Sequence, residues 1–349
     1  MSLPVVLASP APAPRQDGFS RTLKGMALDS DHALLTIGMA QIAPVWLDRT
    51  ATLEKVSAYI ELAAKQGCHL VVFGEALVPG YPFWVERTDG ARFNSTLQKA
   101  IFAEYADQAV QPEAGDLDGV RTLAACHRLA VYLGTVERAV DRGAHSLYCS
   151  LVFIDPQGTI GSIHRKLVPT YEERLVWSPG DGHGLRTHRL RAFQAGALNC
   201  WENWMPLSRT SLYAQGENLH VAVWPGSAQN TRDITRFIAL ESRSYVASVS
   251  GLMRRQDLGT SQPWREAVAA ASPDLLANGG SCVAGPDGEW LVPPAPAEEG
   301  LLVATLDHRR VLEERHNFDV SGHYSRPDVT RLEVDRKRQA LAVFSDPKP

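Results

Sequence analysis

Residues 196–207 read Gly-Ala-Leu-Asn-Cys-Trp-Glu-Asn-Trp-Met-Pro-Leu, a short apolar run that ends in a thiol and continues with polar and aromatic residues. The apolar run predicts a buried strand, and residues 206–214 have the pattern of a helix. Cys200 should therefore project from a strand-to-helix corner, where a nucleophile can be presented outside the packed core. The backbone N–H groups after such a corner can hold negative charge that develops on a substrate.

Two further apolar runs end in a chemically useful side chain. Residues 69–75, His-Leu-Val-Val-Phe-Gly-Glu, end in Glu75, and the following residues 76–84 contain too much proline and glycine to continue as a strand. Residues 160–166 lead to Lys166, and Pro169 then turns the chain away. In open α/β sheets the ligand crevice lies outside the carboxyl ends of the strands, so an acid, an amine and a thiol at three such ends form a coherent set.

Taken singly, each of these residues has a simpler interpretation. A free cysteine is usually a small buried hydrophobe, and a glutamate or lysine at the end of a strand is usually a solvated surface charge. Glu172 and Glu173 can form an exposed acidic face opposite Arg174, and Glu202 can cap the helix that follows it. The ordered occurrence of acid, lysine and thiol favours the functional interpretation.

The three segments resemble, in order and spacing, the Glu, Lys and Cys motifs of the nitrilase branch of the carbon–nitrogen hydrolase superfamily. The resemblance extends from residue 35 to residue 328 and includes residues 177–182 and 322–328. It implies Cys200 as nucleophile, Glu75 as general base and acid, and Lys166 as stabiliser of the tetrahedral species. It also implies a second carboxylate that positions Lys166 or water; Glu173 precedes Arg174 as the family's acid precedes an arginine, and Glu172 is the competing candidate.

These groups suffice for nitrile hydrolysis. A nitrile carbon is a poor electrophile, so it needs a thiolate, a proton for nitrogen and a fixed positive charge. Cys200, Glu75 and Lys166 supply these, with the Trp201 N–H as a further donor, so a covalent thioimidate and then a thioester are expected and no metal or organic cofactor is required. Partial burial should raise the pKa of Glu75, and Lys166 should lower it. The expected function is hydrolysis of an organic nitrile to a carboxylic acid and ammonia.

Other activities remain open at this point. Free cyanide or an amide are alternative substrates within the superfamily, and early collapse of the tetrahedral intermediate would release an amide. A protease-like Cys-His pair is disfavoured because no histidine occupies a comparable strand-end motif, and a non-catalytic scaffold would not need to retain all three groups. The choice between aliphatic, aromatic and arylacetonitrile substrates depends on loop packing. Tyr81, Trp201 and Trp84 are the expected substrate contacts, since tryptophans gather in the motif segments and can line an apolar cavity.

Composition agrees with a cytoplasmic enzyme. The chain has 349 residues and a net charge of −4, which gives no electrostatic case for nucleic-acid or membrane binding, and no apolar run is long enough to span a bilayer. Five cysteines are present; the four besides Cys200 show no metal or disulfide spacing, and we expect Cys68, Cys126, Cys149 and Cys282 to be packing residues. Histidines 127, 183, 316 and 323 lack a second ligand at metal-site spacing, so no metal site is expected.

The pattern of elements predicts a mixed α/β fold without an internal repeat. Strands are expected at residues 35–41, 130–136, 219–224 and 245–250, with hairpins turning at residues 155–158 and 286–288. Helices are expected at residues 50–66, with Thr50 as N-cap, and at 94–109, 118–129 and 231–242. The resemblance implies a four-layer α-β-β-α sandwich that pairs through helices into homo-oligomers, dimer-based and able to form spirals.

We expect three regions along the chain. Residues 1–32 are expected to be a disordered leader, because prolines soon interrupt the opening apolar run, and residues 33–320 the catalytic domain. Residues 321–349 are expected to be a tail at a subunit interface, because residues 329–343 are too apolar for a purely solvated segment.

Overall fold

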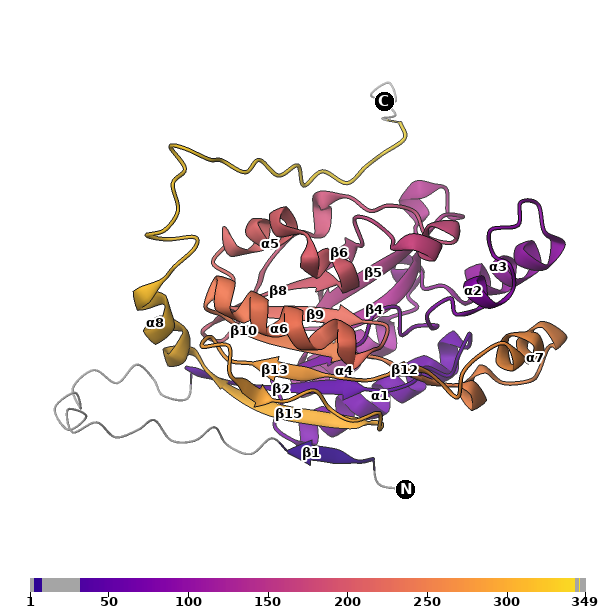
Figure 1. Cartoon of the computed structure of the whole chain (residues 1–349), viewed down its shortest axis with the longest axis horizontal. Coiled ribbons are helices and arrows are strands. Elements are labelled where there is room, and N and C mark those ends of the chain that lie inside the picture. The colour runs from indigo at the N-terminus through magenta and orange to yellow at the C-terminus, as the bar shows by residue number, and fades with distance from the viewer. Residues whose placement is uncertain (1–2, 8–31, 343–344, 346–349) are drawn as a thin grey trace.

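The computed structural model describes residues 3–7, 32–342 and 345, and two stacked β-sheets form its centre (Figure 1). The first sheet has seven strands, in the spatial order β1 (Val5–Leu7), β15 (Gly300–Asp307), β2 (Leu34–Gln41), β3 (Leu70–Phe73), β4 (Ala130–Arg138), β5 (Leu147–Ile154) and β6 (Ile160–Arg165). The second has six, in the order β14 (Trp290–Val292), β13 (Cys282–Ala284), β10 (Tyr245–Ser250), β9 (Leu219–Trp224), β8 (Phe193–Asn199) and β7 (His188–Leu190). A separate pair joins β11 (Leu252–Arg254) to β12 (Leu275–Asn278).

Helices cover the outer face of each sheet. The first sheet carries α1 (Arg49–Lys65) and α4 (Asp118–His127), and the second carries α5 (Pro206–Tyr213) and α6 (Ala228–Ser242). Near one end of the molecule α2 (Trp84–Arg87), α3 (Thr96–Gln108) and α7 (Pro263–Ala270) project from the sheets, and α8 (His308–Asn317) follows β15 (Figure 1). These layers are the expected four-layer α-β-β-α sandwich.

The alternation of side chains along β3 shows how the layers are held. Leu70 and Val72 face the second sheet and belong to the core between the sheets, whereas Val71 and Phe73 face α1 and α4. All four side chains are buried, as expected for a strand covered on both faces. A continuous apolar run is the sequence pattern that such a strand requires.

Several expected elements agree closely with the structure, and some details differ. The strand expected at residues 219–224 is β9, and the hairpin that turns at residues 155–158 joins β5 to β6. The predicted cap of α1 was wrong: Asp48, not Thr50, is the N-cap, because its carboxylate accepts a hydrogen bond from the Ala51 N–H. The helix consequently begins one residue earlier than expected.

The two terminal regions were predicted to lie outside the folded domain. Most of the expected leader falls outside the described residues, but Val5–Leu7 forms β1, which pairs in parallel with β15 and so differs from the expectation of disorder. Near the other end, Arg338 donates to the side chain of Asp181 and to the carbonyl of Ile163 in β6. Leu341 is 97% exposed in the single chain, and the predicted subunit interface stays a prediction. Within the described ranges, no helix combines the length and apolar character that crossing a membrane demands.

Candidate active site

Glu75 lies just beyond the carboxyl end of β3, where the chain leaves the first sheet. Its backbone N–H donates to the Trp224 carbonyl at the end of β9, so this residue also joins the two sheets. A Cβ atom at Gly134 on β4 would lie 2.0 Å from the Gly74 carbonyl oxygen and 2.9 Å from the Glu75 Cα. Glycine at position 134 is therefore what allows the Glu75 segment to pass so close to β4.

Lys166 follows β6 and reaches the same place from the neighbouring hairpin. Its Nζ atom lies 2.9 Å from Glu75 Oε1 and 2.7 Å from Glu173 Oε2, and its side chain is 0% exposed. The hydrogen bond from its N–H to the Cys149 carbonyl continues the pairing of β5 and β6 by one residue. The hairpin thus fixes the backbone of Lys166, and two carboxylates fix its ammonium group.

Glu173 belongs to a short 3₁₀ helix, Tyr171–Leu175, that follows the turn after Pro169. Its Oε2 accepts from the Thr170 N–H at 2.6 Å as well as from Lys166, and its Oε1 accepts from the Tyr81 hydroxyl at 3.0 Å. Glu172, the competing candidate, is half-buried. In the part of the chain that the structure describes, its side chain accepts a hydrogen bond only from the Tyr81 hydroxyl, at 3.3 Å. The structure therefore brings Glu173, and not Glu172, onto Lys166.

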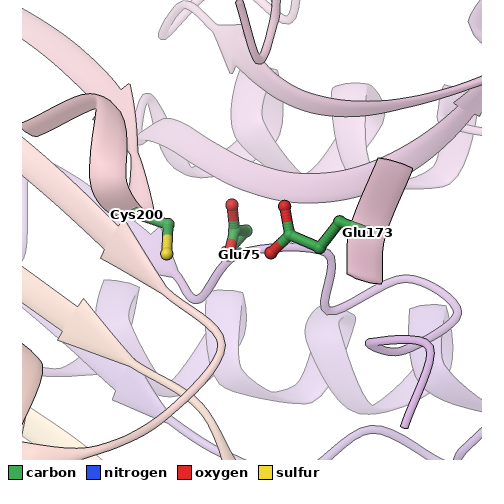
Figure 2. Close-up of side chains that lie close together, drawn as sticks. All are labelled: Glu75, Glu173 and Cys200. Carbon is green, nitrogen blue, oxygen red and sulfur yellow. The ribbon is translucent and has the colours of Figure 1, made fainter. Parts of the chain in front are cut away.

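Cys200 comes from the other sheet, immediately after β8. Its φ of 47° lies in the left-handed region, which is uncommon for a residue with a Cβ, and it begins the 3₁₀ helix Cys200–Trp204. The expected strand-to-helix corner is therefore a sharp turn at the thiol itself. The expectation that Cys200 lies outside the packed core was wrong, because the residue is only 3% exposed and packs in an apolar cluster with side chains of β9 and α6. Ligand atoms of Glu75, Glu173 and Cys200 all lie within 4.8 Å of one another, and Figure 2 shows the thiol and both carboxylates directed into one space.

The charges in this space are mutually dependent. Burial raises the pKa of Glu75 to about 7, and Lys166 opposes this rise. Burial alone would lower the pKa of Lys166, but Glu75, Cys200 and Glu173 raise it well above its usual value. Burial and Glu75 raise the pKa of Cys200 well above its ordinary range, against the lowering effects of Lys166 and the Trp201 N–H. The thiol is therefore protonated at rest, next to a carboxyl group that can exchange a proton near neutral pH.

Cys149 is a site residue that the sequence did not reveal. We expected it to be a packing residue on a strand, and it is buried, but its Sγ lies 3.4 Å from Glu75 Oε1 as a hydrogen-bond donor. An apolar run around a cysteine indicates burial without indicating which neighbouring strand it faces. Only the pairing of β4 with β5, and the passage of the Glu75 segment over β4, could have identified this contact.

The three expected substrate contacts occupy different surroundings. Tyr81 is half-buried, donates to Glu173 and packs edge-on against Trp177 at 5.6 Å between ring centroids. The Trp201 side chain is 53% exposed beside Cys200. Trp84 is fully buried, and its described ring contacts are to Tyr105 and Trp46 rather than to the four polar groups.

Glu75, Glu173 and Cys200 are also the one trio of close metal-type donors found in the described part of the chain. Lys166 Nζ lies within 2.9 Å of both carboxylates, so an ammonium group supplies the positive charge that a cation would bring. A metal would have to displace this ammonium or share the carboxylates with it. The donor set therefore fits an acid–lysine–thiol centre better than a metal centre.

Comparison with known proteins places this geometry in context. Residues 36–315 match the carbon–nitrogen hydrolase family. A nitrilase 2 from an unknown prokaryotic organism is 36% identical over 89% of this chain and 96% of its own length, and an aliphatic nitrilase from Sinorhizobium fredii is 36% identical over 87% and 97%. A crystal structure of a carbon-nitrogen hydrolase from Helicobacter pylori superposes with a TM-score of 0.64 at 21% identity, covering 84% of this chain and 96% of that one, which shows a shared fold.

Proposed function

Because the chain belongs to the carbon–nitrogen hydrolase family, we propose that it is a nitrilase, which converts an organic nitrile and two waters to a carboxylic acid and ammonia. Curated nitrilases at 36% identity over almost their full lengths support this assignment. The observation that carries it at the level of chemistry is the convergence of Glu75, Lys166, Glu173 and the Cys200 thiol in one buried space.

In the first half of the proposed reaction the thiol adds to the nitrile. Glu75 takes the Cys200 proton as sulfur attacks carbon, because the raised pKa of the thiol leaves little free thiolate. The same proton passes to the nitrile nitrogen, which gives a thioimidate. Lys166 and the Trp201 N–H stabilise the negative charge on nitrogen in the transition state.

In the second half two waters enter in turn. Glu75 deprotonates the first, which adds to the thioimidate carbon, and the tetrahedral species expels ammonia after a proton returns to nitrogen. The second water hydrolyses the remaining thioester, releases the acid and restores the thiol. Glu173 holds the Lys166 ammonium group in place. It also accepts a hydrogen bond from the Tyr81 hydroxyl, which connects this aromatic residue to the ion pair.

The experiment that tests the function is a substrate panel with the Cys200→Ala variant as its control. Nitriles should yield mainly acid with one equivalent of ammonia, the matching amides should be much poorer substrates, and Cys200→Ala should fold but not turn over. Mass spectrometry of enzyme quenched during turnover should find an adduct on the Cys200 peptide. Efficient hydrolysis of amides with every nitrile and cyanide untouched would assign amidase activity instead, and an active Cys200→Ala would remove the thiol from the mechanism.

The proposal includes a homo-oligomer in the cytoplasm. Helices α5 and α6 lie side by side, joined by Arg209 and Glu241 at 2.8 Å, and expose large apolar side chains, among them Leu207 and Phe237. Such side chains on the outer layer of a sandwich suit pairing of two copies through these helices. A reducing compartment suits a mechanism that needs a free thiol, and all five cysteines are unpaired.

A further inference from the structure

Behind Cys200 lies a second chain of polar groups, made of Asn203, His220 and Glu217, that the mechanism above does not use. All three residues are 0% exposed. His220 Nε2 lies 2.7 Å from Asn203 Oδ1, and His220 Nδ1 lies 3.0 Å from Glu217 Oε1. Asn203 Nδ2 in turn donates to the carbonyl oxygens of Cys200, at 2.8 Å, and Leu198, at 3.3 Å.

Donor and acceptor chemistry fixes the direction of these bonds. The two carbonyl oxygens can only accept, so the amide nitrogen of Asn203 must face them and its oxygen must face His220. Because that oxygen also only accepts, His220 Nε2 must carry a proton. Nδ1 and Glu217 then share the other proton of the pair, as an imidazolium with a carboxylate or as a neutral imidazole with a carboxylic acid.

The backbone of β8 is shaped to admit this chain. His220 lies on β9 directly beside Gly196 of β8, and a Cβ atom at Gly196 would lie 2.1 Å from Glu217 Oε1. The glycine that begins the Cys200 motif therefore leaves the space in which the Glu217 carboxylate reaches His220. β8, β9 and the turn that carries Asn203 together place the Asn203 side-chain amide against the Cys200 carbonyl.

What the amide holds is the peptide that joins Cys200 to Trp201. In a planar trans peptide the C=O and N–H bonds point in opposite directions. Fixing the Cys200 carbonyl on Asn203 therefore fixes the Trp201 N–H toward the opposite side, where it interacts with the Cys200 sulfur. The positive φ of Cys200 is an unfavourable backbone conformation, so this peptide needs such a restraint to keep its orientation.

We propose that Asn203 is a positioning residue for the nucleophile and for the Trp201 N–H, and that His220 and Glu217 hold its amide in the required orientation. The proposal rests on Cys200 being the nucleophile of the proposed function. A donor that must face charge developing in the transition state contributes to kcat more than to substrate binding. These three hydrogen-bonded side chains therefore affect kcat without contacting the substrate.

The experiment compares Asn203→Ala with Asn218→Ala in the full-length enzyme. Asn218 is a matched control, since it lies just before β9 and is also buried, but its side chain bonds to Gln194 and His308. Asn203→Ala should lower kcat on the order of tenfold to a hundredfold with little change in KM, and should slow alkylation of Cys200 by iodoacetamide. Asn218→Ala should leave kcat and the alkylation rate close to those of the wild type even if it unfolds more easily.

Two conservative variants keep the test decisive if Asn203→Ala folds poorly. In Asn203→Asp only the protonated carboxyl can donate to the Cys200 carbonyl, so its kcat relative to wild type should rise as pH falls. His220→Gln retains an N–H donor for Asn203 and should keep more activity than His220→Ala. Wild-type kcat in Asn203→Ala, or a flat ratio for Asn203→Asp, would overturn the inference while an inactive Cys200→Ala leaves the proposed function intact.

Discussion

At the residue scale, the opposing effects of burial and charge on Glu75 predict how activity depends on pH. Burial raises the pKa of Glu75 to about 7, although Lys166 and the Cys149 thiol both lower it. Glu75 must be ionised to accept the Cys200 proton, so kcat/KM should fall as pH drops below about 7. In Cys149→Ala the carboxylate loses a donor, so its pKa should rise and the acid limb should move to higher pH. Measured pH profiles check this, with Cys126→Ala as the control, because Cys126 is exposed and not the packing residue that the sequence predicted. An acid limb that does not move in Cys149→Ala would show that the Cys149 thiol does not influence the pKa of Glu75.

Also at this scale, Glu75 and Lys166 should behave as one unit. Glu75→Gln removes the base, and Lys166→Ala leaves Glu75 and Glu173 buried without their shared cation. Each change should lower kcat/KM on the order of a hundredfold or more, and the double variant should lose much less than the product of the two. Steady-state kinetics of the two single variants and the double variant measure this coupling. Losses that multiply would mean that the two groups act independently.

At the scale of single elements, the cap of α1 offers a test of stability that does not involve the site. Asp48→Ala removes the acceptor of the Ala51 N–H and should lower the free energy of unfolding by about 1 kcal/mol, with unchanged kcat. Thr50→Ala is the matched control, because Thr50 is exposed inside the first turn and makes no cap. Denaturant unfolding of both variants compares them. A loss of stability confined to Thr50→Ala would instead identify Thr50 as the cap, and equal losses would mean that the Asp48 carboxylate contributes no more than Thr50.

Elements of this fold are predictable where burial alone decides them. The run at residues 219–224 is apolar except for one histidine, and it became β9 with the expected bounds. The cap of α1 was mistaken because Asp48 and Thr50 are both good capping residues, and only the path of the chain before the helix distinguishes them. The positions of Glu75, Lys166 and Cys200 at strand ends followed from sequence. The contacts of Cys149, Asn203 and His220 did not, because each depends on which strands become neighbours.

At the scale of the whole molecule, the exposed apolar side chains of α5 and α6 predict how the chain assembles. Phe237 is 49% exposed on α6, and a charge there would have to be buried if two copies pair through this face. Phe237→Glu should therefore lower the molar mass observed by light scattering after size-exclusion chromatography. Phe93→Glu is the control, since Phe93 is 96% exposed between α2 and α3 and should leave the mass unchanged. An unchanged mass in both variants would place any subunit contact elsewhere.

The position of β15 late in the sequence determines when the first sheet can be completed during synthesis. This strand follows every element of the second sheet in the chain, yet it lies inside the first sheet, between β1 and β2. A growing chain that has already exposed Glu75, Lys166 and Cys200 still lacks the strand that completes the sheet holding Glu75. We infer that the thiol meets its base only after residues 300–307 have left the ribosome. In unfinished chains the Cys200 thiol would then lack its base.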